Sequence, residues 1–190
     1  MTIDEQRHLL RCGVARSDVD KLELPMPTTA MLATASFAAG KRSVLVLAGA
    51  VGTGKTLAAA HWLLNAKRWA DADQWSWDVD SSAFVKASRL FRLNLRFGPE
   101  RELFDRYCRM RWLAVDDLGL EVADRNIVDQ FFDERCSRQV KTAITTNLVC
   151  PTPKRPDCAF KEAYGDRVVS RMAQNGTFAH TGTLDLRRSR

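Results

Sequence analysis

The sequence predicts a three-layer α/β fold in which helices cover both faces of a mostly parallel sheet. Short apolar runs typical of buried strands alternate with longer helix-forming segments along the 190 residues. The run at 41–49 is apolar over most of its length, as expected of a strand in a parallel sheet covered on both sides. The chain is long enough for one domain with a sizeable core, so a single domain accommodates every predicted element.

The first 40 residues are predicted to form a short N-terminal leader, and residues 41–190 the main domain. The leader begins with a helical stretch near residues 4–13, and the prolines of "LELPMPTT" interrupt regular structure after it. A second helix over 28–40 ends at Gly40, a residue type common just beyond a helix. A leader of this size is too small for an independent domain.

Helices and strands alternate after the first strand. The alternating polar and apolar residues of "QWSWDVD" predict the second strand at 74–80. Ser81 and Ser82 are suitable N-caps for a helix across 83–97. The remaining predicted elements are helices at 55–70, 99–110, 124–138 and 159–176, and strands at 111–119, 141–148 and 177–186.

Composition excludes several classes of protein. Hydrophobic residues make up 45% of the chain, and no apolar run approaches the roughly 20 residues that a membrane span needs. The N-terminus has early acidic residues and no apolar segment of the secretory type. Five scattered cysteines without a C-x-x-C pair argue against a disulfide framework or a zinc site. These features predict a reduced, cytoplasmic protein without a membrane partner.

The segment "GAVGTGKT" at residues 49–56 matches the pattern G-x-x-x-x-G-K-[ST] and follows a predicted strand. Its glycines allow successive backbone N–H groups to face a phosphate, and the following helix adds the positive end of its dipole. Lys55 is expected to reach the β- and γ-phosphates, and the Thr56 hydroxyl to ligate Mg²⁺. The cofactors predicted are therefore ATP and Mg²⁺. The expected nucleotide-binding residues are Gly49, Ala50, Val51, Gly52, Thr53, Gly54, Lys55, Thr56 and Leu57.

A second acidic site follows in "WLAVDD", where four apolar residues precede Asp116 and Asp117. Asp116 is expected to hold Mg²⁺, and Asp117 to orient or deprotonate the attacking water. Aspartate is one methylene shorter than glutamate, so a scaffold that binds ATP and barely hydrolyses it remains an alternative. A P-loop kinase acting on a small molecule is a second alternative, because such an enzyme also needs a phosphate-binding loop.

Four segments in order, "GAVGTGKT", "WLAVDDLGLE", "TAITTNL" and "YGDRVVSRM", resemble those of the AAA+ ATPases. Within that class the chain looks most like the group of DnaC-type helicase loaders and IstB-type transposition ATPases. The pattern "DDLG" followed by Glu121 is the most specific feature. The ending "TGTLDLRRSR" is similar to the short tail of that group. The resemblance implies a P-loop AAA+ core without the helical lid domain, and ATP hydrolysis as the activity.

The resemblance also implies roles for polar residues later in the chain. Asn147 corresponds to the sensor-1 residue beside the γ-phosphate. Arg171 corresponds to the arginine finger, with Arg167 as the second candidate. A finger that acts on the neighbouring subunit requires head-to-tail assembly into a ring or a helical filament. The expected assembly is therefore a homo-oligomer with nucleotide at each interface.

The same resemblance implies a DNA-contacting helix after the second strand. Lys86, Arg89, Arg92 and Arg96 recur at spacings of three and four in the helix predicted across 83–97. The net charge of +6 is compatible with contacts to a phosphate backbone, although a solvated basic face is the alternative. The favoured function is a helicase loader on single-stranded or duplex DNA, with a replicative helicase as partner. A transposase-recruiting ATPase is the alternative.

Overall fold

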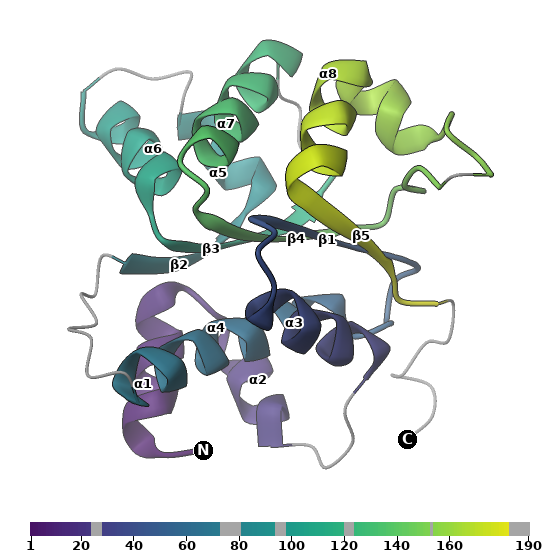
Figure 1. The fold of residues 1–190 in the computed structure, drawn as a ribbon. Helices are drawn as coiled ribbons and strands as arrows, with labels where there is room; N and C mark the ends of the chain where they lie inside the picture. The colour runs from purple at the N-terminus through teal and green to yellow at the C-terminus, as the bar shows by residue number, and fades with distance from the viewer. Residues whose placement is uncertain (24–27, 73–80, 94–97, 120–123, 153, 183–190) are drawn as a thin grey trace.

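The computed structural model describes residues 1–190 apart from 24–27, 73–80, 94–97, 120–123, 153 and 183–190. Five strands form one sheet in the order β2-β3-β4-β1-β5 (Figure 1). Each pairing between neighbouring strands is parallel. The strands are β1 (Val44–Ala48), β2 (Ser82–Lys86), β3 (Trp112–Leu118), β4 (Lys141–Thr146) and β5 (Gly176–His180).

Helices cover both faces of this sheet, and the three-layer α/β fold predicted from the sequence is confirmed (Figure 1). The four helices that come first in the chain lie on one face, and the four that come later lie on the other. The first group is α1 (Ile3–Cys12), α2 (Arg16–Val19), α3 (Thr29–Ala39) and α4 (Lys55–Ala72), with a 3-10 turn at Asp20–Glu23. The second group is α5 (Ala87–Leu93), α6 (Pro99–Arg109), α7 (Arg125–Ser137) and α8 (Ala159–Asn175).

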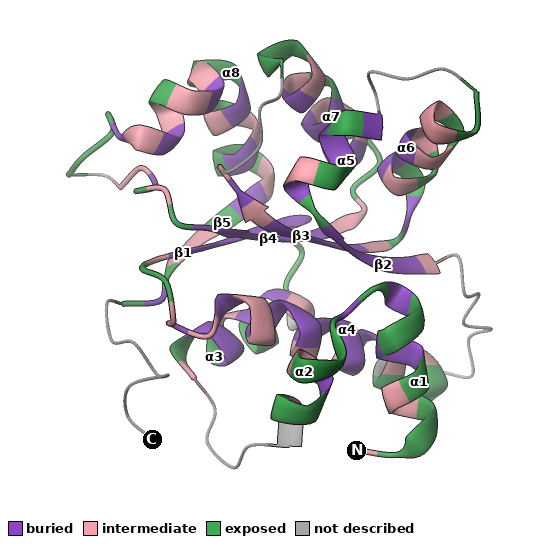
Figure 2. Cartoon of the chain, turned by 180° about the vertical axis from the view of Figure 1, so that it is seen from behind, coloured by how far each residue is buried: buried purple, intermediate pink, exposed green. Residues whose placement is uncertain are grey.

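The inner strand β1 is buried along its whole length because it contributes side chains to both apolar layers. Val44 and Val46 belong to the cluster under α5–α8, whereas Leu45 and Leu47 belong to the cluster under α1–α4. Buried residues accordingly follow the sheet and the inward sides of the helices (Figure 2). Alternate side chains of a strand point to opposite faces, so an uninterrupted apolar run is what a covered parallel strand requires.

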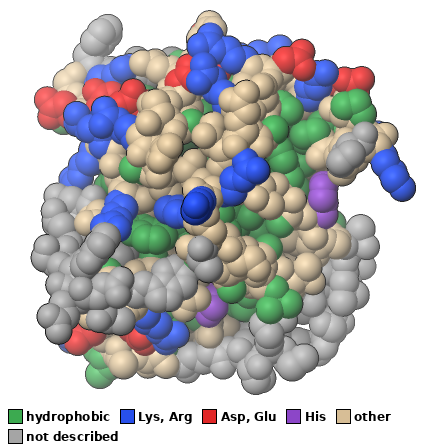
Figure 3. Space-filling model, in the orientation of Figure 1, with side chains coloured by type: hydrophobic (Ala, Val, Ile, Leu, Met, Phe, Trp, Pro, Cys, Tyr) green, Lys and Arg blue, Asp and Glu red, His purple; other side chains and the backbone are tan. Residues whose placement is uncertain are grey.

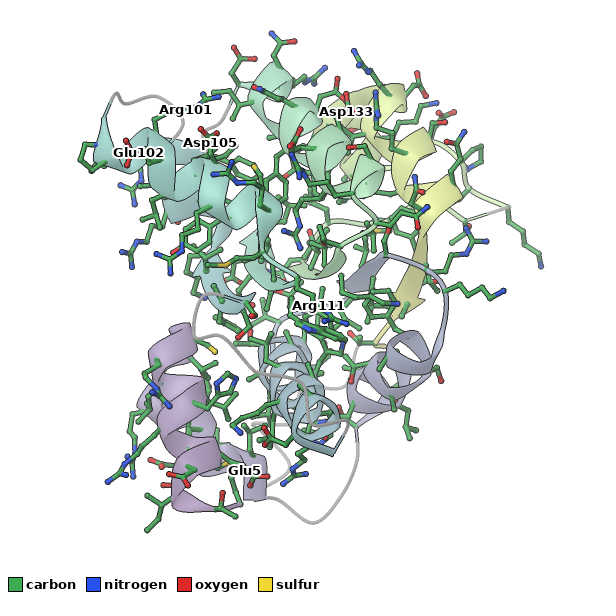
Figure 4. The ribbon with its side chains drawn as sticks, turned by 60° about the vertical axis from the view of Figure 1, so that its left-hand side comes forward. Glu5, Arg101, Glu102, Asp105, Arg111 and Asp133 are labelled. Atoms are coloured by element: carbon green, nitrogen blue, oxygen red, sulfur yellow. The ribbon has the colours of Figure 1, made fainter. Side chains whose placement is uncertain are left out.

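The first 40 residues pack onto the same core as the residues that follow. Thr2 caps α1 through a capping box with Glu5, and the Glu5 carboxylate also accepts a 2.7 Å hydrogen bond from Arg68 on α4 (Figure 4). Leu9 of α1 shares an apolar cluster with Trp62 of α4. The described residues on the two sides of residue 40 thus form one apolar layer, and the division of the chain at that point remains a prediction.

The prediction for residues 83–97 is wrong in its first part. Ser82–Lys86 is strand β2, which pairs with β3 in register Phe84↔Ala114, and helix α5 begins at Ala87. Residues 94–97 of the predicted helix fall outside the described part of the chain. Ser82 does not cap a helix: its buried hydroxyl lies 3.2 Å from the sulfur of Cys12. Burial against β3 and α1 therefore overrides the local helical pattern. The strand predicted at 74–80 falls outside the described residues.

The last predicted helix and strand form with two differences. Helix α8 contains a break at Gly165, whose φ of 84° lies in the left-handed region that favours glycine. Strand β5 ends at His180, earlier than predicted, and residues 183–190 fall outside the described part. No helix in the described ranges combines the length and the apolarity that a membrane span requires.

Two basic side chains at the amino ends of the strands, Arg42 and Lys141, donate hydrogen bonds to carbonyl groups at the ends of helices. Arg42 donates to the carbonyls of Ala173 and Gln174 in the last turn of α8. Lys141 Nζ donates to the Gly40 carbonyl just after α3, at 2.7 Å. The carbonyls in the last turn of a helix have no partner within the helix, so a cation that binds them stabilises the end of the helix. Part of the basic composition therefore has a role in folding rather than in phosphate binding.

Candidate nucleotide-binding site

The glycine-rich loop joins the end of β1 to the start of α4, as the motif predicts. Gly52 and Gly54 adopt left-handed φ angles of 85° and 82°, which turn the backbone between the strand and the helix. The Thr53 hydroxyl donates a 3.0 Å hydrogen bond to the Ala50 carbonyl across this turn. The loop therefore has the shape that directs consecutive N–H groups toward one anion at a helix N-terminus.

Lys55 points back into the loop. Its buried ammonium donates hydrogen bonds to the carbonyls of Gly49 (2.8 Å) and Ala50 (2.7 Å). An ammonium in a sheltered position binds an anion more strongly than it binds neutral carbonyls, because charge-assisted hydrogen bonds are the stronger type. The position of Lys55 thus fits a phosphate group, as the sequence predicts.

Asp116 lies at the carboxyl end of β3, beside the start of α4. Its side chain is fully buried, and Oδ1 accepts hydrogen bonds from Thr56 (2.9 Å) and Thr145 (2.6 Å). The structure therefore brings together the two residues predicted to hold Mg²⁺, Thr56 and Asp116. A hydroxyl and a carboxylate are the hard oxygen ligands that Mg²⁺ prefers, so this pair fits the metal of a Mg-nucleotide complex.

Asp117 has an unusual backbone conformation at the same strand end. Its φ of 59° lies in the left-handed region, and the pairing of β3 with β4 shifts register between Val115 and Leu118. The Asp117 N–H donates to the Thr145 hydroxyl at 2.9 Å. A left-handed aspartate is uncommon, and the bulge turns its partly exposed carboxylate away from the strand. This geometry is compatible with a carboxylate that faces a ligand.

Thr145 is a site residue that the sequence analysis missed. Its single hydroxyl contacts the carboxylate of Asp116 and the backbone of Asp117, and thereby orients both acids. It lies next to last in the buried strand β4, which contains two other threonines, so nothing in the local pattern separated it from an ordinary strand threonine. Only the parallel pairing of β3 with β4, which places Thr145 beside the two acids, identifies it as a site residue.

Lys86 occupies a place that the sequence analysis did not foresee. The prediction that it shares a helical face with three arginines is wrong, because it ends strand β2. Its ammonium lies 2.6 Å from Asp116 Oδ2 and 2.5 Å from Asp117 Oδ2. Partial burial would lower the pKa of Lys86, but its hydrogen bonds to the two carboxylates raise the pKa overall. The lysine therefore offsets part of the negative charge of the two acids in the described structure.

Replacing Lys86 with methionine is expected to lower the Mg²⁺ concentration that nucleotide binding requires. The substitution keeps the apolar stem but removes a cation that competes with Mg²⁺ for the same carboxylates. Since the side chain is 53% exposed, solvent weakens the effect, and we expect the half-saturating Mg²⁺ concentration to fall about fivefold, or about 1 kcal/mol. A magnesium titration of nucleotide binding measures this. Lys41→Met, an exposed lysine ahead of β1, is the control and should leave the titration unchanged.

Asn147 directly follows β4, which lies between β1 and β3 in the sheet. The backbone carbonyl of Thr146 accepts a hydrogen bond from the N–H of Gly49, and the hydroxyl of Thr146 donates to the Leu118 carbonyl. The exposed Asn147 thus comes at the edge of the sheet between the glycine-rich loop and the two acids. Its placement is compatible with the sensor-1 role, which remains a prediction.

Arg167 and Arg171 lie away from this site, on α8. Both form ion pairs with Asp129 and Asp133 of α7, and Asp133 is directed toward α8 (Figure 4). The Arg171 side chain is 29% exposed, whereas that of Arg167 is 68% exposed. Helix α8 runs back toward the amino ends of the strands, so Arg171 does not converge with the acids of its own chain.

The predicted DNA-binding residues are only partly described. Arg89 and Arg92 are exposed on the short helix α5, and Arg96 falls outside the described residues. Lys and Arg side chains are spread over the middle and upper parts of the face seen in Figure 1 rather than gathered into one dominant cluster (Figure 3). The contact of Arg89 and Arg92 with DNA therefore remains a prediction.

The parallel order β2-β3-β4-β1-β5, with the glycine-rich loop between β1 and α4, defines a three-layer α/β fold of the P-loop type. Protein-family models and curated proteins gave no match to the chain. Solved structures do match. The structure of the DnaC helicase loader superposes with a TM-score of 0.68 at 20% identity, over 88% of this chain and 99% of that one.

Two further structures share the fold. The crystal structure of DnaI superposes with a TM-score of 0.59 at 19% identity, over 97% of this chain and 93% of that one. AMPPCP-bound DnaA from Aquifex aeolicus superposes with a TM-score of 0.53 at 17% identity, and covers 89% of this chain but 47% of its own. These likenesses confirm the three-layer α/β fold predicted from the sequence.

Proposed function

We propose that this chain is an ATP-hydrolysing, DNA-associated protein that assembles in the presence of ATP and loads a replicative helicase. The observation that carries the proposal is the convergence of Lys55, Thr56 and Asp116 at one edge of the sheet. These three residues supply the phosphate-binding cation and the metal ligands of a Mg-ATP site. ATP bound there supplies a γ-phosphoryl group for transfer to water.

The likeness to the DnaC helicase loader supports a loader over other P-loop enzymes. The match extends over 99% of that solved chain, so the likeness is not confined to the glycine-rich loop and the strands beside it. DnaI matches over a similar extent. A small-molecule kinase would act as a monomer, and neither Asn147 nor the arginines of α8 would have a role in it.

The test of the proposal is the ATPase rate and the particle size with and without DNA. We expect single-stranded or duplex DNA to change the ATPase rate, and ATP with DNA to produce particles larger than the protein alone. Particle size is measured by light scattering or sedimentation, on the full chain. If neither rate nor size responds to either form of DNA, the DNA-associated function is wrong.

The residues that contact DNA are tested by removing two charges from α5. Arg89→Gln with Arg92→Gln is expected to weaken DNA binding roughly tenfold at low salt. The binding should also depend less on salt, because a protein that contacts fewer phosphates releases fewer counterions when it binds. Fluorescence anisotropy with a labelled oligonucleotide measures both. Lys41→Gln with Arg109→Gln removes the same charge from exposed sites elsewhere. Equal weakening in both pairs would contradict a specific role of α5.

Arg171 is proposed to complete the nucleotide site of the neighbouring subunit. Arg171→Ala is expected to leave nucleotide affinity within about twofold and to reduce the ATPase rate by about 10³-fold, the scale known for arginine fingers. Mixing this variant with Asp117→Asn subunits should restore part of the activity, since each supplies what the other lacks. The ATPase rate of the mixture is the measurement.

A control separates this role from simple packing of α7 against α8. Asp133→Asn disturbs the same ion cluster but retains the arginine. If Arg171 stabilises charge in the reaction, the Asp133→Asn protein keeps most of its ATPase rate. Equal losses in the two variants, with no recovery on mixing, would show that Arg171 has a structural role only.

A second candidate function is a nucleotide-gated scaffold that binds ATP and hydrolyses it slowly. The observation that favours it is the ion pairing of Lys86 with both acids, which leaves neither carboxylate without a cation. Single-turnover hydrolysis measured with an excess of protein over ATP distinguishes the two candidates. A scaffold would assemble in the presence of ATP much faster than it hydrolyses the ATP that it has bound.

A further inference from the structure

Thr181, which lies outside the glycine-rich motif, contacts that loop directly. It follows strand β5, which is the neighbour of β1 at the edge of the sheet. Its backbone N–H donates to the Ala48 carbonyl at 2.8 Å, and its hydroxyl oxygen lies 3.2 Å from the same carbonyl oxygen. Thr181 is buried, so these contacts are sheltered from water. The last carbonyl of β1 is thus held from the side of β5.

The same hydroxyl also reaches the middle of the loop. Thr181 Oγ1 lies 2.8 Å from Thr53 Oγ1, and either hydroxyl can be the donor. Thr53 is buried and donates in turn to the Ala50 carbonyl at 3.0 Å. Each hydroxyl has one proton, so with Thr53 donating to Ala50, the Thr181 hydroxyl donates to Thr53 while its backbone N–H keeps the Ala48 carbonyl. Thr181 is thereby linked to the carbonyls of both Ala48 and Ala50.

The close packing at Gly49 shows how tightly Thr181 fits the loop. A Cβ atom at Gly49 would overlap the Thr181 hydroxyl and would lie 3.0 Å from the carbonyl of Gly182. The first glycine of the motif is therefore required by its contact with Thr181 and Gly182. Gly182 then turns the chain away with a φ of 82°.

We propose that Thr181 is a positioning residue of the nucleotide site, which holds the loop in its phosphate-binding conformation through Thr53. The inference rests on the proposed function, because it assumes that the loop binds the phosphates of ATP. Gly52 and Gly54 give the loop easy access to other backbone conformations. A hydroxyl that restricts the loop before the ligand arrives lowers the entropy that binding must otherwise remove.

The test compares two substitutions of the same residue. Thr181→Val keeps the shape and removes the hydroxyl, and we expect it to weaken the binding of Mg-ATP about fivefold to tenfold. Thr181→Ser keeps the hydroxyl and should remain within about twofold of the unchanged protein. Titration of the full chain with a fluorescent ATP analogue measures both. Thr177→Val, an exposed threonine on the same strand, is the matched control and should bind normally.

A double substitution tests the connection through Thr53. Thr53→Val alone should weaken binding to a similar extent, and Thr53→Val with Thr181→Val should lose less than the sum of the two single losses, because both single variants remove the contact between the two hydroxyls. The melting temperature without nucleotide is measured for every variant. Normal affinity in Thr181→Val, additive losses in the double variant, or equal losses in Thr181→Ser and Thr181→Val would overturn the proposal.

Failure of this inference differs from failure of the proposed function. If Lys55→Ala loses nucleotide binding while Thr181→Val retains it, the site is correct and the role of Thr181 is wrong. If neither substitution changes the affinity, the glycine-rich loop is not the nucleotide site, and both proposals are overturned.

Discussion

Lys55→Ala is expected to weaken Mg-ATP binding about a hundredfold, close to complete loss at cellular nucleotide concentrations. The buried ammonium is the cation within the loop, and it lies on the carbonyls of Gly49 and Ala50. Removing a charge-assisted hydrogen bond to a phosphate costs about 1.5–3 kcal/mol, and about 2.7 kcal/mol corresponds to a hundredfold change. Equilibrium titration with a fluorescent ATP analogue in excess Mg²⁺ is the measurement.

The control for this substitution is Lys67→Ala on the same helix. Lys67 pairs with Asp71 far from the loop, so its loss removes a lysine from α4 without altering the site. We expect normal nucleotide affinity for Lys67→Ala. Unchanged affinity in Lys55→Ala would falsify the assignment of the phosphate-binding loop, and with it the proposed ATPase activity.

Arg135→Met is expected to lower the free energy of unfolding by about 3 kcal/mol or more. The guanidinium is fully buried and donates to four carbonyl oxygens and one hydroxyl. Methionine fills much of the volume but leaves these oxygens without a donor, and each buried acceptor without a partner costs about 1–3 kcal/mol. Burial of the charged guanidinium is itself unfavourable and lowers the pKa of Arg135 to about 9. Removing that buried charge therefore offsets part of the loss in the free energy of unfolding. Urea unfolding followed by circular dichroism is the measurement.

The acceptors of Arg135 explain why the effect is large. They include the carbonyls of Tyr107 and Cys108 in the last turn of α6, and that of Lys141 at the start of β4. One side chain therefore satisfies the end of a helix and the beginning of a strand. Arg138→Met is the matched control, because Arg138 is exposed and pairs only with Glu134 among the described residues. Its loss should change the free energy by less than about 1 kcal/mol, and similar losses in both variants would contradict the role of Arg135.

Sequence reasoning was most reliable where a segment's own chemistry determines its structure. Strand β1 is apolar on both faces, and the loop after it needs glycines whatever packs around it, so both were predicted near their observed bounds. The acids Asp116 and Asp117 were found in the same way, because a strand followed by two carboxylates is visible in a short window. Predictions of this kind depend on residues that are neighbours in the chain.

Strand β2 was missed because its signal is not local. Val85 and Phe84 lie in a segment whose spacing also fits a helix, and only burial against β3 and α1 selects the strand. That selection moved Lys86 from a helical surface to the two acids. An error in one short element therefore gave Lys86 the wrong partner, because the sequence predicted a nucleic acid and the structure shows Asp116 and Asp117.

The sequence alone determined the class of fold, the glycine-rich loop after β1 and the two acids at the end of β3, since these follow from local pattern and from the chemistry of glycine, lysine and aspartate. Only the tertiary structure decided which residues support them. Thr145, Thr181 and Lys86 reach the site from other strands, across pairings between distant parts of the chain. A hydrogen bond or an ion pair depends on distances of a few ångströms between such parts, and the folding of the whole sheet sets those distances.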